Sequence, residues 1–242
     1  GDLEAALAAW QALGGAGAPE RAVALGLGRT LLSLGRFEEA LAALDPVLTP
    51  DAAALAGAAA YYLGRLGEAE TRFRAVLVAR PDHASASFGL AVVLVEKGDL
   101  AQAKATLDRA EGLHLADPSW PLAVEAVLAE REGGAAAAGP LYDAARAANP
   151  TNWFVDWAQG RGLLETGEPS EAQPYLLSAL SAAFEFTDTV DRLGLTALQL
   201  GDAEASRRYF EESASREPTP VRMVYVAAAR LFTRQSRMQV QR

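Results

Sequence analysis

A glycine recurs along this chain at a nearly constant interval. Its positions are Gly1, Gly35, Gly64, Gly98, Gly133, Gly167 and Gly201, and the successive spacings are 34, 29, 34, 35, 34 and 34. We call the commonest of these spacings the repeat period. Self-similarity at a fixed period of about 20 to 50 residues indicates stacked copies of one supersecondary unit. We therefore expect a linear array of similar units, with the glycine at the turn between the two helices of each unit.

Other positions repeat in register with the turn glycine. Five residues after it stands a small residue, and four residues later a bulky one, which places both on one helix face. The small residues are Ala6, Ala40, Ala69, Ala103, Ala138, Ala172 and Ser206, and the bulky ones are Trp10, Leu44, Phe73, Leu107, Tyr142, Leu176 and Phe210. A second small position, seven residues before the glycine, holds Gly28, Gly57, Ala91, Ala126, Gly160 and Gly194. We interpret these columns as helix packing.

The order of these residues resembles the tetratricopeptide repeat. The family pattern is matched by Leu27-Gly28-x2-Leu31, by Ala40-x3-Leu44, and by Leu193-Gly194 with Phe210 and Pro218. Further prolines, Pro81 and Pro150, close two other repeats. The resemblance implies an all-α fold, a right-handed superhelical solenoid of antiparallel helix pairs.

This register predicts the domain organisation. Residues 1–218 are expected to form the solenoid, which consists of the second half of one repeat and then six repeats. The repeats are expected to begin near residues 21, 50, 84, 119, 153 and 187. Residues 219–242 are expected to form a basic helix, either a cap or the start of a further repeat. One unit is short, because Pro46 and Pro50 interrupt its second helix.

Composition excludes several classes of site. Cysteine is absent, which removes disulfides, thiolate zinc sites and cysteine nucleophiles. The net charge is −9 and residues 219–242 carry +5, so residues 1–218 sum to −14 and do not suit a nucleic-acid partner. No apolar run is long enough for a membrane span, and the N-terminal sequence does not have the layout of a signal peptide.

Catalytic and cofactor motifs are also missing from the sequence. His83 and His114 lie near expected inter-repeat turns and outside any metal-ligand spacing, and we interpret both as surface loop residues. The stretch from Gly26 to Thr30 lacks the spacing of a phosphate-binding loop. We therefore expect no enzyme activity, no metal and no cofactor.

In the tetratricopeptide family, the first helix of each hairpin lines the concave face. Carried onto this sequence, that resemblance implies a groove for a protein partner, either a helix or an extended peptide of apolar or amphipathic character. The candidate residues are Arg29, Tyr61, Tyr62, Phe88, Val92, Trp120, Phe154, Trp157 and Arg161. The hypothesis is that Trp157 and Arg161, with Phe88 and Tyr62, carry partner binding; the alternative is that the aromatic residues only pack.

The leading functional hypothesis is a non-catalytic scaffold in a bacterial multiprotein assembly. A regulatory or targeting region of a larger enzyme is the alternative, and self-association through the terminal repeats is a third option. The bacterial origin is inferred from a bias toward arginine, since the only lysines are Lys97 and Lys104, and from the absence of isoleucine. The sequence does not decide between the bacterial cytoplasm and the periplasm, and association with the cell envelope is a further option. Membrane contact is expected only through the basic segment 219–242, for which a cap docked on the solenoid is the preferred reading.

Overall fold

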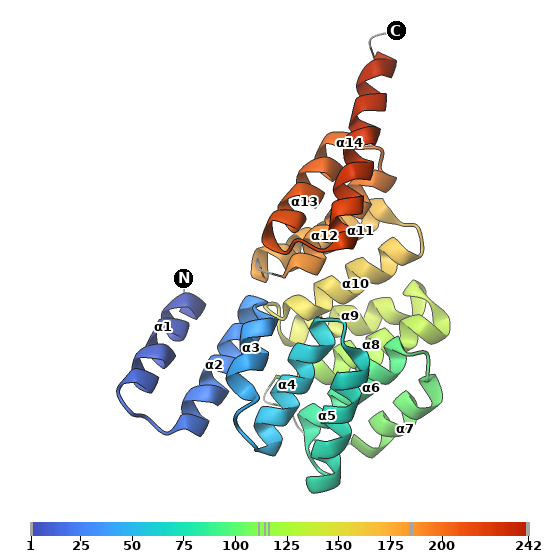
Figure 1. The fold of residues 1–242 in the computed structure, drawn as a ribbon. Coiled ribbons are helices and arrows are strands. Elements are labelled where there is room, and N and C mark those ends of the chain that lie inside the picture. Colours follow the sequence, from blue (N-terminus) through green and yellow to red (C-terminus); the bar gives the residue numbers. More distant parts are fainter. Residues whose placement is uncertain (1, 111, 114, 116, 184–185, 241–242) are drawn as a thin grey trace. The chain divides into compact units, whose positions relative to one another are not determined.

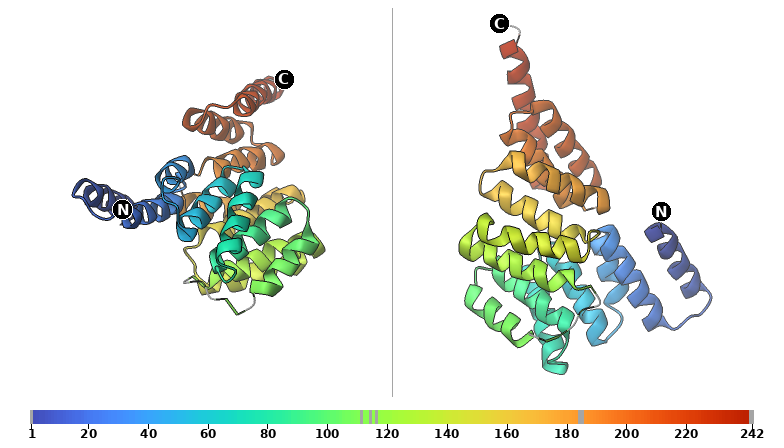
Figure 2. Two further views of the ribbon diagram at one scale, coloured as in Figure 1. Left: turned by 60° about the horizontal axis from the view of Figure 1, so that its bottom comes forward. Right: turned by 180° about the vertical axis from the view of Figure 1, so that it is seen from behind.

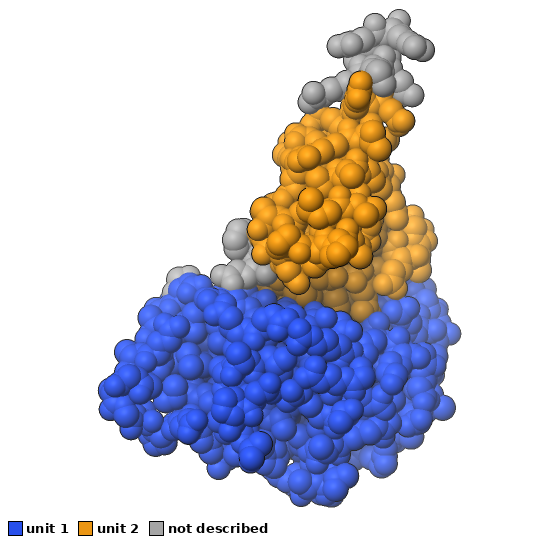
Figure 3. Space-filling view, viewed as in Figure 1, with its two compact units in different colours: residues 1–149 blue, residues 150–242 orange. Residues whose placement is uncertain are grey.

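The computed structural model is all-helical in the residues it describes, which are 2–110, 112–113, 115, 117–183 and 186–240, without the side chains of 236–240. It forms two compact units, residues 1–149 and residues 150–242 (Figure 3). Unit 1 contains α1 (Asp2–Gly15), α2 (Glu20–Leu34), α3 (Phe37–Leu44), α4 (Pro50–Tyr62), α5 (Leu66–Ala79), α6 (Ala84–Glu96), α7 (Leu100–Ala110), α8 (Ser119–Gly133) and α9 (Ala135–Ala148). Unit 2 contains α10 (Trp153–Glu165), α11 (Pro169–Ala182), α12 (Thr187–Gln199), α13 (Ala203–Arg216) and α14 (Pro220–Val240).

Consecutive helices pair as hairpins (Figure 1). The pairs are α2–α3, α4–α5, α6–α7 and α8–α9 in unit 1, and α10–α11 and α12–α13 in unit 2. First helices also contact the first helix of the next hairpin within each unit, as α4 contacts α6, and Figure 2 shows these hairpins stacked side by side within unit 1. The prediction of an all-α solenoid is confirmed. The expected division between residues 218 and 219 stays a prediction.

Most hairpin turns are closed by a glycine with positive φ. At the first of them, Gly35 has φ 82°, its amide donates to the Leu32 carbonyl and the next amide, of Arg36, donates to the Leu31 carbonyl. This is a helix-terminating arrangement that a residue with a Cβ adopts at a cost. The prediction that Gly133 closes the fourth turn was wrong. Gly133 is the last residue of α8 and Gly134 has the positive φ, because α9 begins directly after it.

The recurring small and bulky residues pack against each other inside each hairpin. A Cβ added at Gly57 would lie 2.8 Å from the Phe73 ring, and one added at Gly160 would lie 2.8 Å from the Leu176 Cγ. The bulky side chains of the second helices therefore fill space that the absent side chains of the first helices leave. This confirms the interpretation of these columns as packing.

Helix α3 is short because of the proline that follows it. It ends at Leu44, two residues before Pro46, and Thr49 then caps α4 by accepting a hydrogen bond from the Ala52 amide. Proline at the first position of α4 is well placed, since that amide has no helical partner. The expected interruption of this repeat is confirmed.

His83 is not a surface loop residue, contrary to the sequence interpretation. Its imidazole is buried at the N-cap of α6, where Nδ1 accepts a hydrogen bond from the Ala86 amide. Its Nε2 lies 3.1 Å from the Asp51 carboxylate on α4, so the side chain joins two neighbouring first helices. His114 lies outside the described residues.

Candidate protein-binding surface

The first helices of unit 1 form one stacked row. Helices α2, α4, α6 and α8 contact each other in that order, so residues that share a column lie in successive helices along the stack. Six of the predicted groove residues belong to this row of helices. They are Arg29, Tyr61, Tyr62, Phe88, Val92 and Trp120.

Solvent reaches four of these six side chains. Arg29 on α2 is exposed, and Tyr61, Tyr62 and Trp120 are half-buried. The tyrosines lie on α4 and the tryptophan on α8, so the accessible groups come from three of the four helices. We refer to these four residues as the unit 1 aromatic surface.

Phe88 and Val92 on α6 are buried. Their helix contributes an almost entirely apolar stretch to the core, since Leu90 and Val93 on its other faces are buried as well. A helix that is apolar all round is packed on all sides. Phe88 and Val92 are therefore core residues of unit 1.

The two tyrosines of α4 hold each other and a neighbouring ring in place. The Tyr62 ring stacks on Phe37, with centroids 4.6 Å apart and planes at 23°, and Tyr61 meets Tyr62 edge-on at 5.2 Å. Burial, with a contribution from the adjacent Tyr61 phenol, raises the pKa of Tyr62 well above its ordinary value. Tyr62 consequently stays neutral at physiological pH and offers a rigid apolar face with a hydroxyl at its edge.

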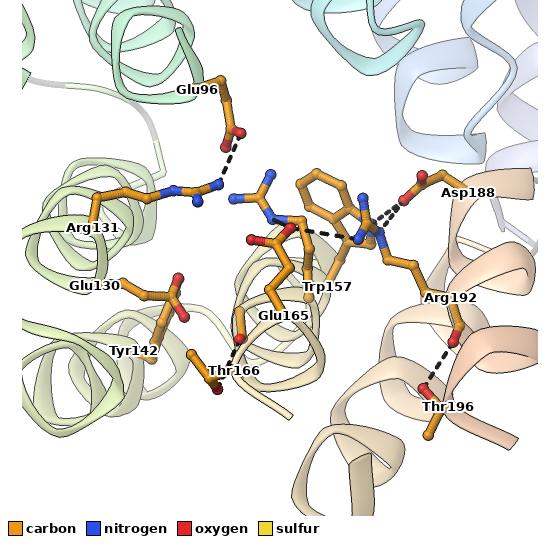
Figure 4. A network of polar contacts seen from close by, with 12 residues as sticks. Glu96, Glu130, Arg131, Tyr142, Trp157, Glu165, Thr166, Asp188, Arg192 and Thr196 are labelled. Atoms are coloured by element: carbon orange, nitrogen blue, oxygen red, sulfur yellow. Dashed lines mark hydrogen bonds and ion pairs between the residues drawn. The ribbon is translucent and has the colours of Figure 1, made fainter. Parts of the chain in front are cut away.

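Charged groups line the ends of the first helices in unit 1. The Arg131 guanidinium, at the end of α8, lies 3.3 Å from the Glu96 carboxylate at the end of α6 (Figure 4). Within the α8–α9 hairpin, the Tyr142 hydroxyl donates a hydrogen bond to Glu130 over 2.9 Å. The first contact joins two consecutive hairpins, and the second joins the two helices of one hairpin.

In unit 2, the predicted groove residues Phe154, Trp157 and Arg161 all lie on α10 and are buried. The Trp157 ring is enclosed by other aromatic rings, with Phe154 at 5.6 Å and Phe186 at 5.5 Å between centroids. Only 5% of Trp157 and 4% of Arg161 is exposed. The structure thus brings these three residues together, and it places them in the interior.

Two arginines and two carboxylates surround Trp157. The guanidinium carbons of Arg161 and Arg192 lie 4.9 Å and 5.5 Å from the centroid of the tryptophan ring, within the range of cation–π attraction. The indole Nε1 and the Arg192 Nε both donate to Asp188, over 2.7 Å and 2.6 Å, and the Glu165 carboxylate lies 3.8 Å from both arginines (Figure 4).

This polar shell was missed by reasoning from the sequence. Its signal was present, because Arg161 and Glu165 on α10, and Asp188 and Arg192 on α12, are each four residues apart and share a helix face. What the sequence did not reveal is that both pairs converge on one indole ring. Of these four charged groups only Arg161 is buried, and the Glu165 carboxylate lies near enough to balance its charge.

No group of three or more potential metal ligands occurs among the described residues, and none of their helices is long and apolar enough to cross a membrane.

Models of the tetratricopeptide repeat match residues 1–56, 54–118 and 189–220. This chain belongs to the tetratricopeptide repeat family. Proteins with this repeat generally bind other proteins or peptides. No curated protein matches the sequence.

Solved tetratricopeptide repeat structures share the fold. A tetratricopeptide repeat protein from Parabacteroides merdae superposes with a TM-score of 0.61 at 15% identity, over 94% of this chain and 92% of that chain. The APC/C hetero-tetramer Cut9–Hcn1 gives 0.63 at 15% identity, over 87% of this chain and 43% of that chain. The type IV pilus biogenesis factor PilW gives 0.53 at 18% identity, over 85% and 97%.

Helix α14 docks on α13. Val226 and Ala229 of α14 are buried against Phe210 of α13, and the Thr233 hydroxyl donates to the Ala203 carbonyl over 3.0 Å. The Arg222 Nε donates to Asp191 of α12 over 2.8 Å. Part of the basic segment expected at residues 219–242 is thus a helix packed on the preceding repeat.

Proposed function

We propose that this chain is a non-catalytic scaffold in a bacterial multiprotein assembly, and that it binds an apolar or amphipathic segment of another protein on the unit 1 aromatic surface. The observation that carries the proposal is the placement of Tyr61, Tyr62 and Trp120, partly accessible, on first helices that belong to one stacked row. Arg29 adds an exposed positive charge on α2.

The chemistry of these side chains favours an apolar partner segment with an acidic group. Aromatic side chains provide large contact areas with few rotatable bonds, so little conformational entropy is lost on binding. The Tyr61–Tyr62–Phe37 stack is held in place before any partner arrives, which lowers the ordering cost further. An acidic residue near one end of the segment would pair with Arg29.

Relatives of the same fold act in assemblies. PilW is described as a pilus biogenesis factor, and Cut9 forms a hetero-tetramer with Hcn1 in APC/C. These descriptions support a scaffold role for the present chain. Phe88, Val92, Phe154, Trp157 and Arg161 are assigned to packing in this proposal, because they are buried.

The test uses a peptide selected against the folded chain from a display library of amphipathic helices. Its affinity is then measured for the wild type and for the variants Tyr61→Ala and Trp120→Ala, with circular dichroism as a check on folding. Loss of a buried aromatic contact at a binding hot spot costs about 2 kcal/mol or more, so we expect affinity to fall roughly thirtyfold.

The matched control is Leu48→Ala, since Leu48 is exposed and lies outside the first helices. This variant should bind the peptide as the wild type does. Equal affinities for wild type, Tyr61→Ala and Trp120→Ala, all folded, would contradict the proposed surface.

A further inference from the structure

Asp51 stands where neighbouring first helices of unit 1 begin. It lies in the first turn of α4, directly after the cap residue Thr49 and a proline. Three basic groups approach its carboxylate: Arg21 of α2 at 3.6 Å, Arg80 at the end of α5 at 3.3 Å, and the His83 imidazole at the N-cap of α6 at 3.1 Å. The Asp51 carboxylate therefore connects the N-terminal ends of α2, α4 and α6.

Of these three basic groups, His83 is the buried one. The Arg21 and Arg80 side chains are 63% and 48% exposed, whereas the His83 side chain is 8% exposed. Exposed ion pairs contribute little, because water and salt screen them and long side chains lose freedom when they form. The contact between His83 and Asp51 is thus the one that matters most for the position of α6 relative to α4.

The hydrogen bonds of His83 define its tautomer and its orientation. Nδ1 accepts from the Ala86 amide over 3.3 Å, so this nitrogen carries no proton. The proton of the neutral imidazole is then on Nε2, which donates to the Asp51 carboxylate over 3.1 Å. His83 is itself held in α6, since its carbonyl accepts from the Ser87 amide over 3.0 Å. One oriented side chain consequently joins the first turns of two neighbouring first helices.

The contact between α4 and α6 lies between the accessible aromatic groups of unit 1. Tyr61 and Tyr62 belong to α4 and Trp120 belongs to α8, and α6 contacts both of these helices. The position of α6 relative to α4 therefore contributes to the spacing between the tyrosines and Trp120. A partner segment that contacts both groups binds more tightly when this spacing is fixed beforehand, because ordering on binding lowers affinity.

We propose that His83, through its hydrogen bond to Asp51, is a positioning residue that fixes the spacing of the unit 1 aromatic surface. The inference rests on the proposed function, in which a partner segment binds that surface. His83 does not contact the partner in this account. It acts on the tyrosines of α4 and on Trp120 through the relative position of α4 and α6.

The variant His83→Asn separates the two hydrogen bonds of the imidazole. Asparagine is a favourable N-cap residue, and Asn152 shows this at the start of α10, where it accepts from the Phe154 amide. The shorter side chain places no donor where Nε2 lies, so the contact with Asp51 is lost while α6 keeps a cap. Asp51→Asn removes the same contact from the other side.

The first measurement needs no partner and uses the absence of cysteine. Spin labels on Ser33→Cys in α2 and Glu132→Cys in α8, both exposed, report the distance between the outer first helices of the row by pulsed electron resonance. We expect one narrow distance distribution with His83 and a broader one after His83→Asn. Identical distributions in the two backgrounds overturn the proposal.

The tautomer of His83 gives a spectroscopic signature of the same contact. Nitrogen NMR of the whole chain at neutral pH should show this ring with an unprotonated Nδ1 and a protonated Nε2, as the two hydrogen bonds require. A ring protonated at Nδ1, or at both nitrogens, contradicts the proposal.

The second measurement is the affinity for the peptide selected against the folded chain. His83→Asn and Asp51→Asn should each lower it roughly threefold to tenfold, the range typical of residues that act on a site without touching its ligand. The double variant should lower it no further, because both changes remove one hydrogen bond. Losses that add in the double variant would show that the two residues act separately, and the proposal falls.

The matched control is Asp45→Asn, which removes an ion pair of 2.9 Å with Arg72 of α5, outside the first helices. It should change neither the affinity nor the distance distribution, and a loss equal to that of His83→Asn overturns the proposal. Full affinity of Tyr61→Ala removes the proposed surface and with it the role of His83 in binding. A loss with Tyr61→Ala and none with His83→Asn overturns the inference about His83 alone.

Discussion

At the scale of the residue, the glycines of the first helices decide how closely the two helices of a hairpin approach. At Gly160 an added Cβ would lie 2.8 Å from Leu176 Cγ and 3.2 Å from the backbone oxygen of Ala172. Backbone cannot move as easily as a side-chain end, so this position has little tolerance. Ala91 and Ala126 occupy the position equivalent to Gly160 in two other hairpins, so a single methyl group fits there.

We predict that Gly160→Val lowers the free energy of unfolding by about 1–3 kcal/mol, because the added side chain overpacks the α10–α11 contact. Chemical denaturation followed by circular dichroism measures this. The control is Gly139→Val in α9, where an added Cβ would meet nothing within 4 Å. Equal stability losses in the two variants would mean that the close approach at Gly160 is not what makes a side chain costly there.

Single residues also show what the sequence could predict. The repeated positions of Gly57 and Phe73 predicted that both are packing residues, because the same residue types recur in every hairpin, and the structure shows that the two contact each other. The role of His83 was not recognised, because its N-cap contact depends on where α6 begins and its second contact is with Asp51 on the preceding first helix. Contacts between repeats that occur once leave no periodic signal.

At the scale of the element, α14 is held on α13 by a small apolar core and on α12 by an ion pair. The side chains of Asp191 and Arg222 are 15% and 14% exposed, and the Ser213 hydroxyl also donates to Asp191. Burial raises the pKa of Asp191, and the hydrogen bonds from Ser213 and Arg222 offset part of that rise. The carboxylate therefore depends on its partners to stay ionised in the folded chain.

We predict that Arg222→Ala destabilises the chain by about 1–3 kcal/mol at pH 7, since it leaves a largely buried carboxylate without its cation. A raised folded-state pKa gives stability that is present in acid and lost as pH rises. The loss caused by Arg222→Ala should therefore shrink as pH falls from 7 into the acid range, where Asp191, with its raised pKa, takes up a proton. Unfolding midpoints across this pH range test it, with Arg234→Ala on the same helix as control; a loss that does not change with pH contradicts the assignment.

The contact between α5 and the end of α6 has the opposite pH dependence. Hydrogen bonds from Lys97, over 2.5 Å, and from Arg74, over 2.8 Å, lower the pKa of Glu70. A lowered folded-state pKa gives stability that is present above the unfolded value and lost as pH falls through the folded one.

We predict that Glu70→Gln costs roughly 0.5–1 kcal/mol at neutral pH, and that this difference disappears in acid as pH falls through the lowered pKa of Glu70 and the wild-type carboxylate is protonated. Stability curves of both proteins over this range provide the measurement. Glu132→Gln, at an exposed position of α8, should show neither effect. A cost for Glu70→Gln that persists in acid would assign it to packing instead.

The elements differ in how far the sequence predicted them. Helix α3 was expected to be short because Pro46 excludes a helical continuation, and this depends on one residue alone. The turn at Gly134 was placed one residue early, since two adjacent glycines, Gly133 and Gly134, give no local preference between them. The sequence left open whether Trp157 binds a partner or only packs, because its surroundings include Asp188 and Arg192 from α12.

At the scale of the whole molecule, binding capacity is proposed to reside in the accessible first-helix residues of unit 1. Repeat proteins present such a surface because each hairpin contacts mainly its neighbours and leaves one side of its first helix available. The resemblance to the tetratricopeptide family implied which positions belong to this side. It did not imply which of them are exposed, because Phe88 and Val92 are contact positions of the family as Tyr61 is, and yet both are buried.

The most direct test is a hydrogen-exchange footprint of the full chain with and without the selected peptide. We predict slower amide exchange on binding in the first helices α2, α4 and α8, which carry Arg29, Tyr61, Tyr62 and Trp120, with little change in α3, α5, α7 and α9. Slower exchange confined to the second helices, or to α10 around Trp157, would contradict the proposed binding surface.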